Sequence, residues 1–325
     1  MNSVVGRVVG ARELGAPGAL WSLAHWFHRS KSQPALGVIP MSSEESGPGS
    51  YVLGTDPEEI ERLRLQHQLW LPAARAAWRS AGLGPGSRVL DVGAGPGFCS
   101  LELARAVGPA GMVLGLELSE AYVDVARHAA DAERLSQLEI RQHDLLTAAI
   151  PERGFDLVWC RWVAMFLPRL EPLLEQLDLA LAPGGRFVAH EYVHWRSFGL
   201  HPHGEAVGRF GAATMASFLG AGGDPDVNRR LPSLLAARGF GIEELRPLPV
   251  IGRCGDPWAR WLERFVAIYG ERLLQQGLWS KADARKAAEE IAIAREDPGS
   301  FWVGPTVLEL RAVRPSIPIS LIIEP

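Results

Sequence analysis

The strongest constraint on the fold is a short apolar run that ends in an acid and passes at once into a glycine-rich turn. Val89-Leu90-Asp91-Val92 precedes Gly93-Ala94-Gly95-Pro96-Gly97, and a helical pattern begins at Phe98. A strand, a glycine turn and a helix in this order are how an open α/β sheet holds an adenosine-containing ligand. The segment therefore predicts the first strand, turn and helix of such a sheet.

Each glycine of this turn has a physical reason, and the spacing narrows the ligand. Gly93 can take the positive φ of a tight turn. Gly95 leaves room for the backbone to approach a ligand, and Gly97 lets the helix pack close to the strand. A dinucleotide fingerprint would require a small residue where Phe98 stands. The spacing thus disfavours a NAD-linked oxidoreductase.

Further strand-like runs follow in a regular order. Three of them are Val113–Ser119, Leu138–Asp144 and Gly154–Cys160. The segment Leu179–Ala189 then reads as a helix, a Pro-Gly-Gly turn and a fifth strand. Strands that alternate with helical patterns from Arg88 to Ala189 predict a parallel sheet with right-handed crossovers. Gly241–Leu248 and Thr306–Val313 read as two later strands.

The Asp-x-Gly-x-Gly-x-Gly turn and the four motifs after it resemble the class I S-adenosylmethionine (SAM)-dependent methyltransferases. The resemblance covers about residues 82–191 closely and extends more loosely to the strand near Thr306–Val313. It implies an α/β fold, a doubly wound and mostly parallel seven-stranded sheet with helical lid insertions. It also implies SAM as the cofactor.

The resemblance further implies which residues bind the cofactor. Those of the glycine turn would hold the methionine moiety, and they are Asp91, Gly93, Ala94, Gly95 and Gly97. Glu117, with Leu118 beside it, would bind two ribose hydroxyls through its two carboxylate oxygens. Asp144, followed by Leu145, would accept a hydrogen bond from the adenine amino group.

Two more cofactor-binding candidates come from outside these motifs. Arg161 follows the fourth strand and is expected to line the pocket or bind the cofactor carboxylate, with a surface ion pair as the alternative. Gln66 lies on a helix before the first strand, together with His67, and Tyr51 precedes that helix. All three are candidates to touch cofactor or substrate, or else are ordinary surface polar residues.

Methyl transfer from a sulfonium is a direct displacement that depends mainly on alignment and on the exclusion of water. A general base helps only where the acceptor must lose a proton. The candidates are His190 and His194, which follow the fifth strand at the expected edge. Strand alternation puts both on one side with Tyr192, and puts Glu191 on the other. The alternative is that these residues only orient the lid.

No metal is predicted. His201 and His203 have a His-x-His spacing without an obvious third ligand. The three cysteines, Cys99, Cys160 and Cys254, lack metal-ligand spacing and are too few for a disulfide framework.

Composition and punctuation divide the chain. Residues 1–50 are poor in acids and then rich in Ser, Gly and Pro, and we expect a disordered leader, with a targeting peptide or a true translation start at Met41 as alternatives. Residues 51–81 are predicted cap helices that Pro72 kinks or splits. Residues 82–315 are the SAM-binding domain, with lid insertions at about 192–228 and 256–298, and 316–325 form a tail.

We therefore predict a cytoplasmic SAM-dependent methyltransferase of a small molecule, a monomer or homodimer, with a preference for an oxygen acceptor. If several lid aromatics face the cleft, the acceptor is apolar or aromatic; they are Trp162, Phe166, Trp195, Trp258, Trp261 and Trp302.

Other partners are disfavoured. The net charge of −4 and the lack of an Asn/Asp-Pro-Pro-aromatic tetrad after the fourth strand argue against DNA, and no apolar run reaches transmembrane length. The alternatives left open are an RNA or protein substrate and a SAM-binding protein without catalysis.

Overall fold

A computed structural model describes residues 57–316, all within one compact unit. The predicted leader, Tyr51, the alternative start at Met41 and the tail beyond Ser316 lie outside the described residues.

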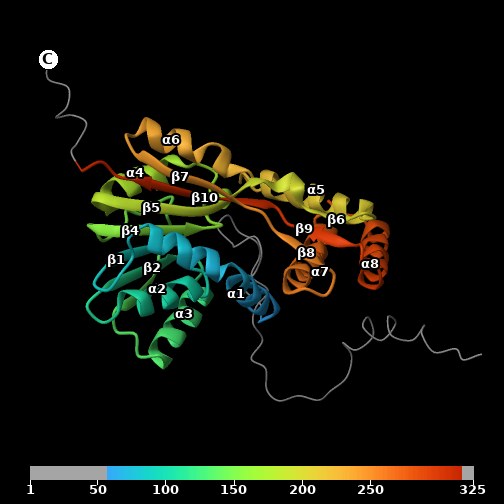
Figure 1. The fold of residues 1–325 in the computed structure, drawn as a ribbon, viewed down its shortest axis with the longest axis horizontal. Helices are drawn as coiled ribbons and strands as arrows, with labels where there is room; N and C mark the ends of the chain where they lie inside the picture. The colour runs from blue at the N-terminus through green and yellow to red at the C-terminus, as the bar shows by residue number, and fades with distance from the viewer. Residues whose placement is uncertain (1–56, 317–325) are drawn as a thin grey trace, which may run out of the picture. The chain divides into compact units, whose positions relative to one another are not determined.

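The main sheet has seven strands in the order β3-β2-β1-β4-β5-β10-β7 (Figure 1). Their bounds are β1 Arg88–Val92, β2 Met112–Glu117, β3 Leu138–Gln142, β4 Phe155–Arg161, β5 Leu181–His194, β7 Gly241–Leu248 and β10 Thr306–Val313. The first five pair in parallel, whereas β10 runs antiparallel to both β5 and β7. This order confirms the predicted doubly wound, mostly parallel seven-stranded sheet.

Helices cover both faces of the sheet, as a parallel sheet requires. One face carries α1 (Pro57–Ser80), α2 (Phe98–Val107) and α3 (Glu120–Ala132), and the other carries α4 (Glu171–Ala180) and α6 (Leu231–Ala237) (Figure 1). The strand β1 is buried along almost its whole length because it lies in the middle of these layers. The carboxyl end of β1 therefore lies among the carboxyl ends of its parallel neighbours, β2 and β4.

The helix α1 is one continuous element, not two. Pro72 lies inside it and is exposed to solvent, while Trp70, Ala74 and Trp78 on the opposite side are buried. Packing of this apolar side compensates for the hydrogen bond that a proline cannot make. The expected split at Pro72 does not occur.

The segments predicted as two insertions pack together, and we use the name lid for the helices and the small sheet that they form. They contain α5 (Glu205–Gly220), α7 (Pro257–Gln275) and α8 (Lys281–Glu296), which gather at one end of the main sheet (Figure 1). A second sheet of three short antiparallel strands joins them in the order β6-β9-β8, with bounds β6 Gly199–His201, β8 Ile251–Arg253 and β9 Phe301–Val303. Strands this short carry no readable alternation, so the sequence did not reveal them.

The first insertion differs from its expected bounds at its start, and the second differs at both ends. The strand β5 continues to His194, so the first insertion starts later than predicted, and β8 and β9 extend the second one on either side. Among residues 57–316 there are also three single 3-10 turns, at Ala164–Phe166, Trp195–Ser197 and Val227–Arg229. No helix between residues 57 and 316 is long and apolar enough to cross a membrane.

Candidate active site

The glycine turn after β1 has the backbone that the sequence predicts. Gly93, Gly95 and Gly97 have φ angles of 66°, 56° and 82°, in the region that favours glycine. A Cβ on Gly93 would lie 2.3 Å from Val163 Cγ2, whereas one on Gly95 would meet nothing within 4 Å. A Cβ on Gly97 would lie 2.6 Å from Ala126 Cβ, so this glycine allows a close approach to α3 and not to the strand. Gly95 thus borders open space where a ligand can reach the backbone.

Asp91 lies at the carboxyl end of β1 and is 2% exposed. Ser100 Oγ donates a hydrogen bond to its carboxylate over 2.6 Å. Burial raises the pKa of Asp91 to about 7, against the opposing effect of that hydrogen bond. Ala94 is also buried, and its N–H donates to the Leu116 carbonyl of β2 at 2.9 Å. The turn is therefore fixed between β1 and β2.

Glu117 ends β2 and contacts the glycine turn directly. Its Oε2 accepts from the Gly95 N–H at 2.8 Å, and its Oε1 accepts from the Ser119 N–H at 2.9 Å. Burial raises the pKa of Glu117, while these N–H donors act in the opposite direction. Each carboxylate oxygen has a second lone pair, so both can still accept from a ligand hydroxyl. The neighbouring Leu118 is 45% exposed.

Asp144 follows β3 beside this acid, because the His143 N–H donates to the Glu117 carbonyl at 2.8 Å. The Asp144 carboxylate accepts from the Leu146 N–H and from Thr147 Oγ1, both at 2.9 Å. Leu145 is buried in the core. Asp91, Glu117 and Asp144 therefore end three successive strands along one edge of the sheet, as the sequence predicts.

Arg161 ends β4 and does not form the surface ion pair weighed as the alternative. Its Nη2 lies 3.3 Å from His67 Nδ1, and its guanidinium lies over the Trp162 ring, 5.1 Å from the centroid. Its Nη1 is buried and has no hydrogen-bond partner among residues 57–316. A buried cationic donor without a partner is costly unless a ligand satisfies it.

His67 is part of this environment and not an ordinary surface residue. It is 7% exposed and lies 3.9 Å from Cys99 Sγ. Burial, helped by Arg161, lowers the pKa of His67 to about 3, so the ring is neutral near pH 7. The sequence named His67 as a candidate to touch cofactor or substrate, but its position three residues before the buried Trp70 did not predict this burial.

A cavity lies between α1, the carboxyl ends of β4 and β5, and the lid. The space between its walls, including the part open to solvent, is about 480 Å³. Its lining residues are mostly aromatic, and they are Arg62, Leu63, Gln66, Trp162, Met165, Phe166, Tyr192, Trp195, Phe198, Phe218, Trp261, Leu262, Phe265 and Pro305.

Four of the six aromatic side chains singled out from the sequence line this cavity, and Trp258 and Trp302 do not. Gln66 also lines it. The Gln66 Oε1 accepts from Trp261 Nε1 at 3.0 Å and from Arg62 Nη1 at 2.8 Å, and so ties α1 to the lid helix α7.

The turn after β4 connects the cavity with the glycine turn. Trp162 has a φ of 52°, which is strained for a bulky residue. Glu191 holds the next two residues, since its Oε1 accepts from the Val163 N–H at 2.7 Å and the Ala164 N–H at 2.9 Å. Trp162 lines the cavity while Val163 packs against Gly93. One short turn thus contacts both halves of the site.

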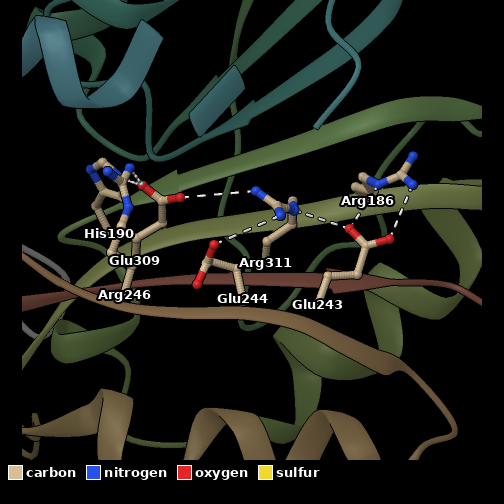
Figure 2. Close-up of polar contacts among 7 residues, drawn as sticks. All are labelled: Arg186, His190, Glu243, Glu244, Arg246, Glu309 and Arg311. Carbon is tan, nitrogen blue, oxygen red and sulfur yellow. Dashed lines mark hydrogen bonds and ion pairs between the residues drawn. The ribbon is translucent and has the colours of Figure 1, made fainter. Parts of the chain in front are cut away.

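The two histidines predicted as bases do not line the cavity. His190 is fully buried, and its Nε2 lies 3.2 Å from Glu309 Oε2 of β10, which also binds Arg246 Nη2 at 2.5 Å (Figure 2). Burial lowers the pKa of His190 against the opposing effect of Glu309. Figure 2 shows this group at one end of a row of charged side chains that crosses β5, β10 and β7.

His194 is exposed, and its Nδ1 lies 3.1 Å from Arg229 Nη2. The member of the alternating set that does reach the cavity is Tyr192. Strand alternation predicted His190, Tyr192 and His194 on one side, but the pairing of β5 with β10 shifts register between Tyr192 and His194. The three side chains have different surroundings, which alternation alone did not indicate.

Within residues 57–316 there is no group of three or more His, Cys, Asp or Glu side chains that could hold a metal ion. His201 and His203 are both exposed.

Comparison with known proteins identifies the domain. Residues 83–209 match the family model of a methyltransferase domain. The chain is 30% identical over 129 residues to a demethylmenaquinone methyltransferase of Lactococcus lactis, covering 40% of this chain and 50% of that protein. It is 35% identical over 101 residues to the aklanonic acid methyltransferase DauC of Streptomyces sp. strain C5, covering 31% and 46%. The chain thus spans about half the length of the curated relatives it matches.

A solved geranyl diphosphate methyltransferase, in complex with GPP and sinefungin, has a similar fold, with a TM-score of 0.50 and 17% identity over 80% of this chain and 84% of that one. The matched segment contains β1 to β5, the glycine turn and the three strand-end acids. It is a methyltransferase domain of the class I, SAM-dependent family, which confirms the family and the cofactor class expected from the sequence. The roles of individual site residues stay predictions.

Proposed function

We propose that this protein transfers a methyl group from SAM to a small apolar molecule held in the aromatic cavity. The observation that carries the proposal is the single turn of Trp162–Ala164, which packs against the glycine turn on one side and lines the cavity on the other. Two adjoining sites for donor and acceptor are what a direct displacement needs.

The residues at the sheet edge fit the cofactor. The open space at Gly95 leaves room for it, and the partnerless Nη1 of Arg161 suits its carboxylate. Asp91 suits its ammonium group, and Glu117 has lone pairs left for two ribose hydroxyls. When bound, SAM supplies a methyl group on a sulfonium, which is already activated for displacement.

The contribution of the protein is to position the acceptor and to exclude water. Aromatic side chains from the turn after β4, from β5 and from the lid enclose the cavity together with three side chains of α1, and the Gln66–Trp261 hydrogen bond holds the lid against α1. No histidine lines the cavity, so we propose an acceptor that needs no histidine base. A neutral hydroxyl that releases its proton to solvent in the course of the transfer meets that condition, and oxygen stays the proposed acceptor atom.

The relatives support a small acceptor, since they are named for demethylmenaquinone, aklanonic acid and a sterol. We further propose a cytoplasmic enzyme, monomeric or homodimeric, that does not act on DNA or at a membrane. The net charge of −4 is consistent with that proposal.

Glu117→Ala tests the proposal through cofactor binding. We expect its affinity for S-adenosylhomocysteine, measured by calorimetry on the full chain, to fall about tenfold or more because two charge-assisted hydrogen bonds are lost. Glu289→Ala, an exposed acid of α8, is the matched control and should bind like the parent. Glu117→Gln keeps the size of the side chain, so a loss there would be due to the charge and the second acceptor oxygen.

The parent chain should bind S-adenosylhomocysteine and should not bind NAD⁺. An affinity unchanged in Glu117→Ala would contradict the ribose assignment. A parent chain that binds no S-adenosylhomocysteine would overturn the proposed function.

A further inference from the structure

The side chains that line the cavity restrict the kind of acceptor more sharply than the size of the cavity does. We infer that it takes an uncharged, planar ring compound whose polar atom meets the hydroxyl of Tyr192, in the manner of a fused-ring phenol. This inference rests on the proposed function, because it identifies the cavity as the acceptor site.

The arrangement of the rings favours a flat ligand. Trp162 is inclined by only 31° to Tyr192, with centroids 5.8 Å apart, and by 31° to Trp261, with centroids 6.4 Å apart. Trp195 and Phe198, which also line the cavity, lie almost parallel, at 9°. Ring faces that share similar orientations pack best against another flat ring, in offset-stacked or edge-to-face contacts.

Among the residues that line the cavity, a ligand anion would find no cation without a countercharge. Arg62 is the only charged residue that lines the cavity. Its Nε and Nη2 donate to the two carboxylate oxygens of Glu59, at 2.7 and 2.6 Å, and its Nη1 donates to Gln66 at 2.8 Å. The ion pair is almost fully buried, so the charge of Arg62 is balanced within α1. An anion entering the cavity would lose its water without gaining a countercharge.

A ligand cation is disfavoured by the same geometry. Aromatic walls can bind cations through their ring faces, but the protein's own cations already occupy two of them. The Arg62 guanidinium lies over Phe265, 5.5 Å from the ring centroid, and that of Arg161 lies over Trp162 at 5.1 Å. A ligand cation would therefore compete with these guanidinium groups for the same ring faces.

One polar group remains for an uncharged ligand. The Tyr192 side chain is 7% exposed and lines the cavity, and its hydroxyl has no hydrogen-bond partner among residues 57–316. Burial raises the pKa of Tyr192, so the hydroxyl keeps its proton near pH 7 and can donate. Tyr192 also belongs to β5, whose carboxyl end faces the cofactor edge. A ligand oxygen that accepts a hydrogen bond from Tyr192 would therefore lie next to the proposed site of the methyl donor.

Four probes of one ring size test the inference on the full chain with S-adenosylhomocysteine present: 2-naphthol, naphthalene, 2-naphthoate and 2-naphthylmethylammonium. We expect 2-naphthol to bind at least about tenfold tighter than either ion at pH 7, because neither charge is compensated in the cavity. We expect it to bind about fivefold tighter than naphthalene because it gains one hydrogen bond. Either ion binding as tightly as 2-naphthol would overturn the inference.

Tyr192→Phe removes only the hydroxyl. It should abolish the preference for 2-naphthol over naphthalene and leave the affinity for naphthalene unchanged. Tyr269→Phe is the matched control, because the Tyr269 hydroxyl bonds Ser217 Oγ at 2.8 Å and does not line the cavity. A preference that survives in Tyr192→Phe would show that another group binds the polar atom.

Calorimetry with S-adenosylhomocysteine in the same samples separates this inference from the proposed function. Binding of S-adenosylhomocysteine without binding of any probe would overturn the cavity ligand alone. Failure to bind S-adenosylhomocysteine would overturn the proposed function, whatever the probes do.

Discussion

At the scale of single residues, Glu191 is the side chain whose importance the sequence did not reveal. It is fully buried, and its Oε1 accepts from the Val163 and Ala164 N–H groups and from Cys160 Sγ at 3.6 Å. Its Oε2 is buried without a partner among residues 57–316. Burial raises the pKa of Glu191 to about 7. The carboxyl group thus fixes the strained turn, and its ionised form destabilises the fold.

This pKa predicts a pH dependence of stability. The folded chain binds a proton at Glu191 more tightly than the unfolded chain, whose pKa stays near 4.5. The contribution of Glu191 to the free energy of unfolding should therefore fall as the pH rises from about 4.5 to about 7. Glu191→Gln keeps a carbonyl acceptor and loses the charge, so its unfolding free energy should fall less over this range. Glu191→Leu leaves two buried N–H groups without an acceptor and should cost about 2–4 kcal/mol.

Denaturant unfolding of the three proteins across this pH range measures both effects. The difference between the parent and Glu191→Gln isolates the contribution of this carboxyl group from that of other titrating groups. Parallel pH profiles for those two proteins would contradict the assignment.

At the scale of an element, the turn of Trp162–Ala164 links the glycine turn and the aromatic cavity through packing. Val163 occupies the space where a Cβ of Gly93 would lie, and Trp162 lines the cavity. Residues held in sparsely populated conformations persist only where the surrounding contacts determine them, and they cluster at functional sites. Here the determining contacts are the two hydrogen bonds to Glu191 and one from the Trp162 N–H to the His190 carbonyl at 3.1 Å.

Replacing the glycines separates steric contact from backbone strain. Gly93→Ala and Gly95→Ala both place an alanine at positive φ, but only the first also overlaps with Val163. We expect Gly93→Ala to be less stable than Gly95→Ala by about 1–3 kcal/mol, the usual cost of overpacking. Val163→Ala should recover part of that loss in the Gly93→Ala background, although it costs stability in the parent. Thermal or denaturant unfolding of the five proteins checks this, and equal losses for the two glycine variants would contradict it.

At the scale of the whole described unit, the lid is one structure made from distant segments. The small sheet joins β6, β8 and β9, which come from three parts of the chain. Glu290 of α8 adds a further link, because its carboxylate accepts from the Ala206 and Val207 N–H groups at the start of α5, at 2.9 to 3.0 Å. A carboxylate at a helix N-terminus satisfies free N–H groups and interacts favourably with the helix dipole.

Removing this helix cap should destabilise the lid and leave the main sheet with α2 and α3 intact. We expect Glu290→Ala to cost about 1 kcal/mol in the lid and to speed amide hydrogen exchange in α5 and α8. Exchange in α2 and α3 should not change. Glu289→Ala, the exposed neighbour on α8, is the control. Faster exchange in all four helices would mean that lid and sheet unfold as one unit.

The sequence by itself determined the sheet and the edge at which the candidate cofactor-binding residues lie. Apolar runs and punctuating turns are local signals, and they located Gly241–Leu248 and Thr306–Val313 with the bounds that the structure has. The positive φ of Gly93 and the placement of Asp91, Glu117 and Asp144 at successive strand ends followed for the same reason. Each depends on residues close together in the chain.

Only the tertiary structure decided which polar side chains face the cavity. His190 is bonded to Glu309, which lies 119 residues further along the chain, and Gln66 is bonded to Trp261, 195 residues away. A buried polar group forms its hydrogen bond with a suitable group that is near it in space. The separation of two residues along the chain does not reveal whether they are close in the folded structure. For this reason His190 lies in a charged row within the sheet, while Tyr192, two residues later, lines the cavity.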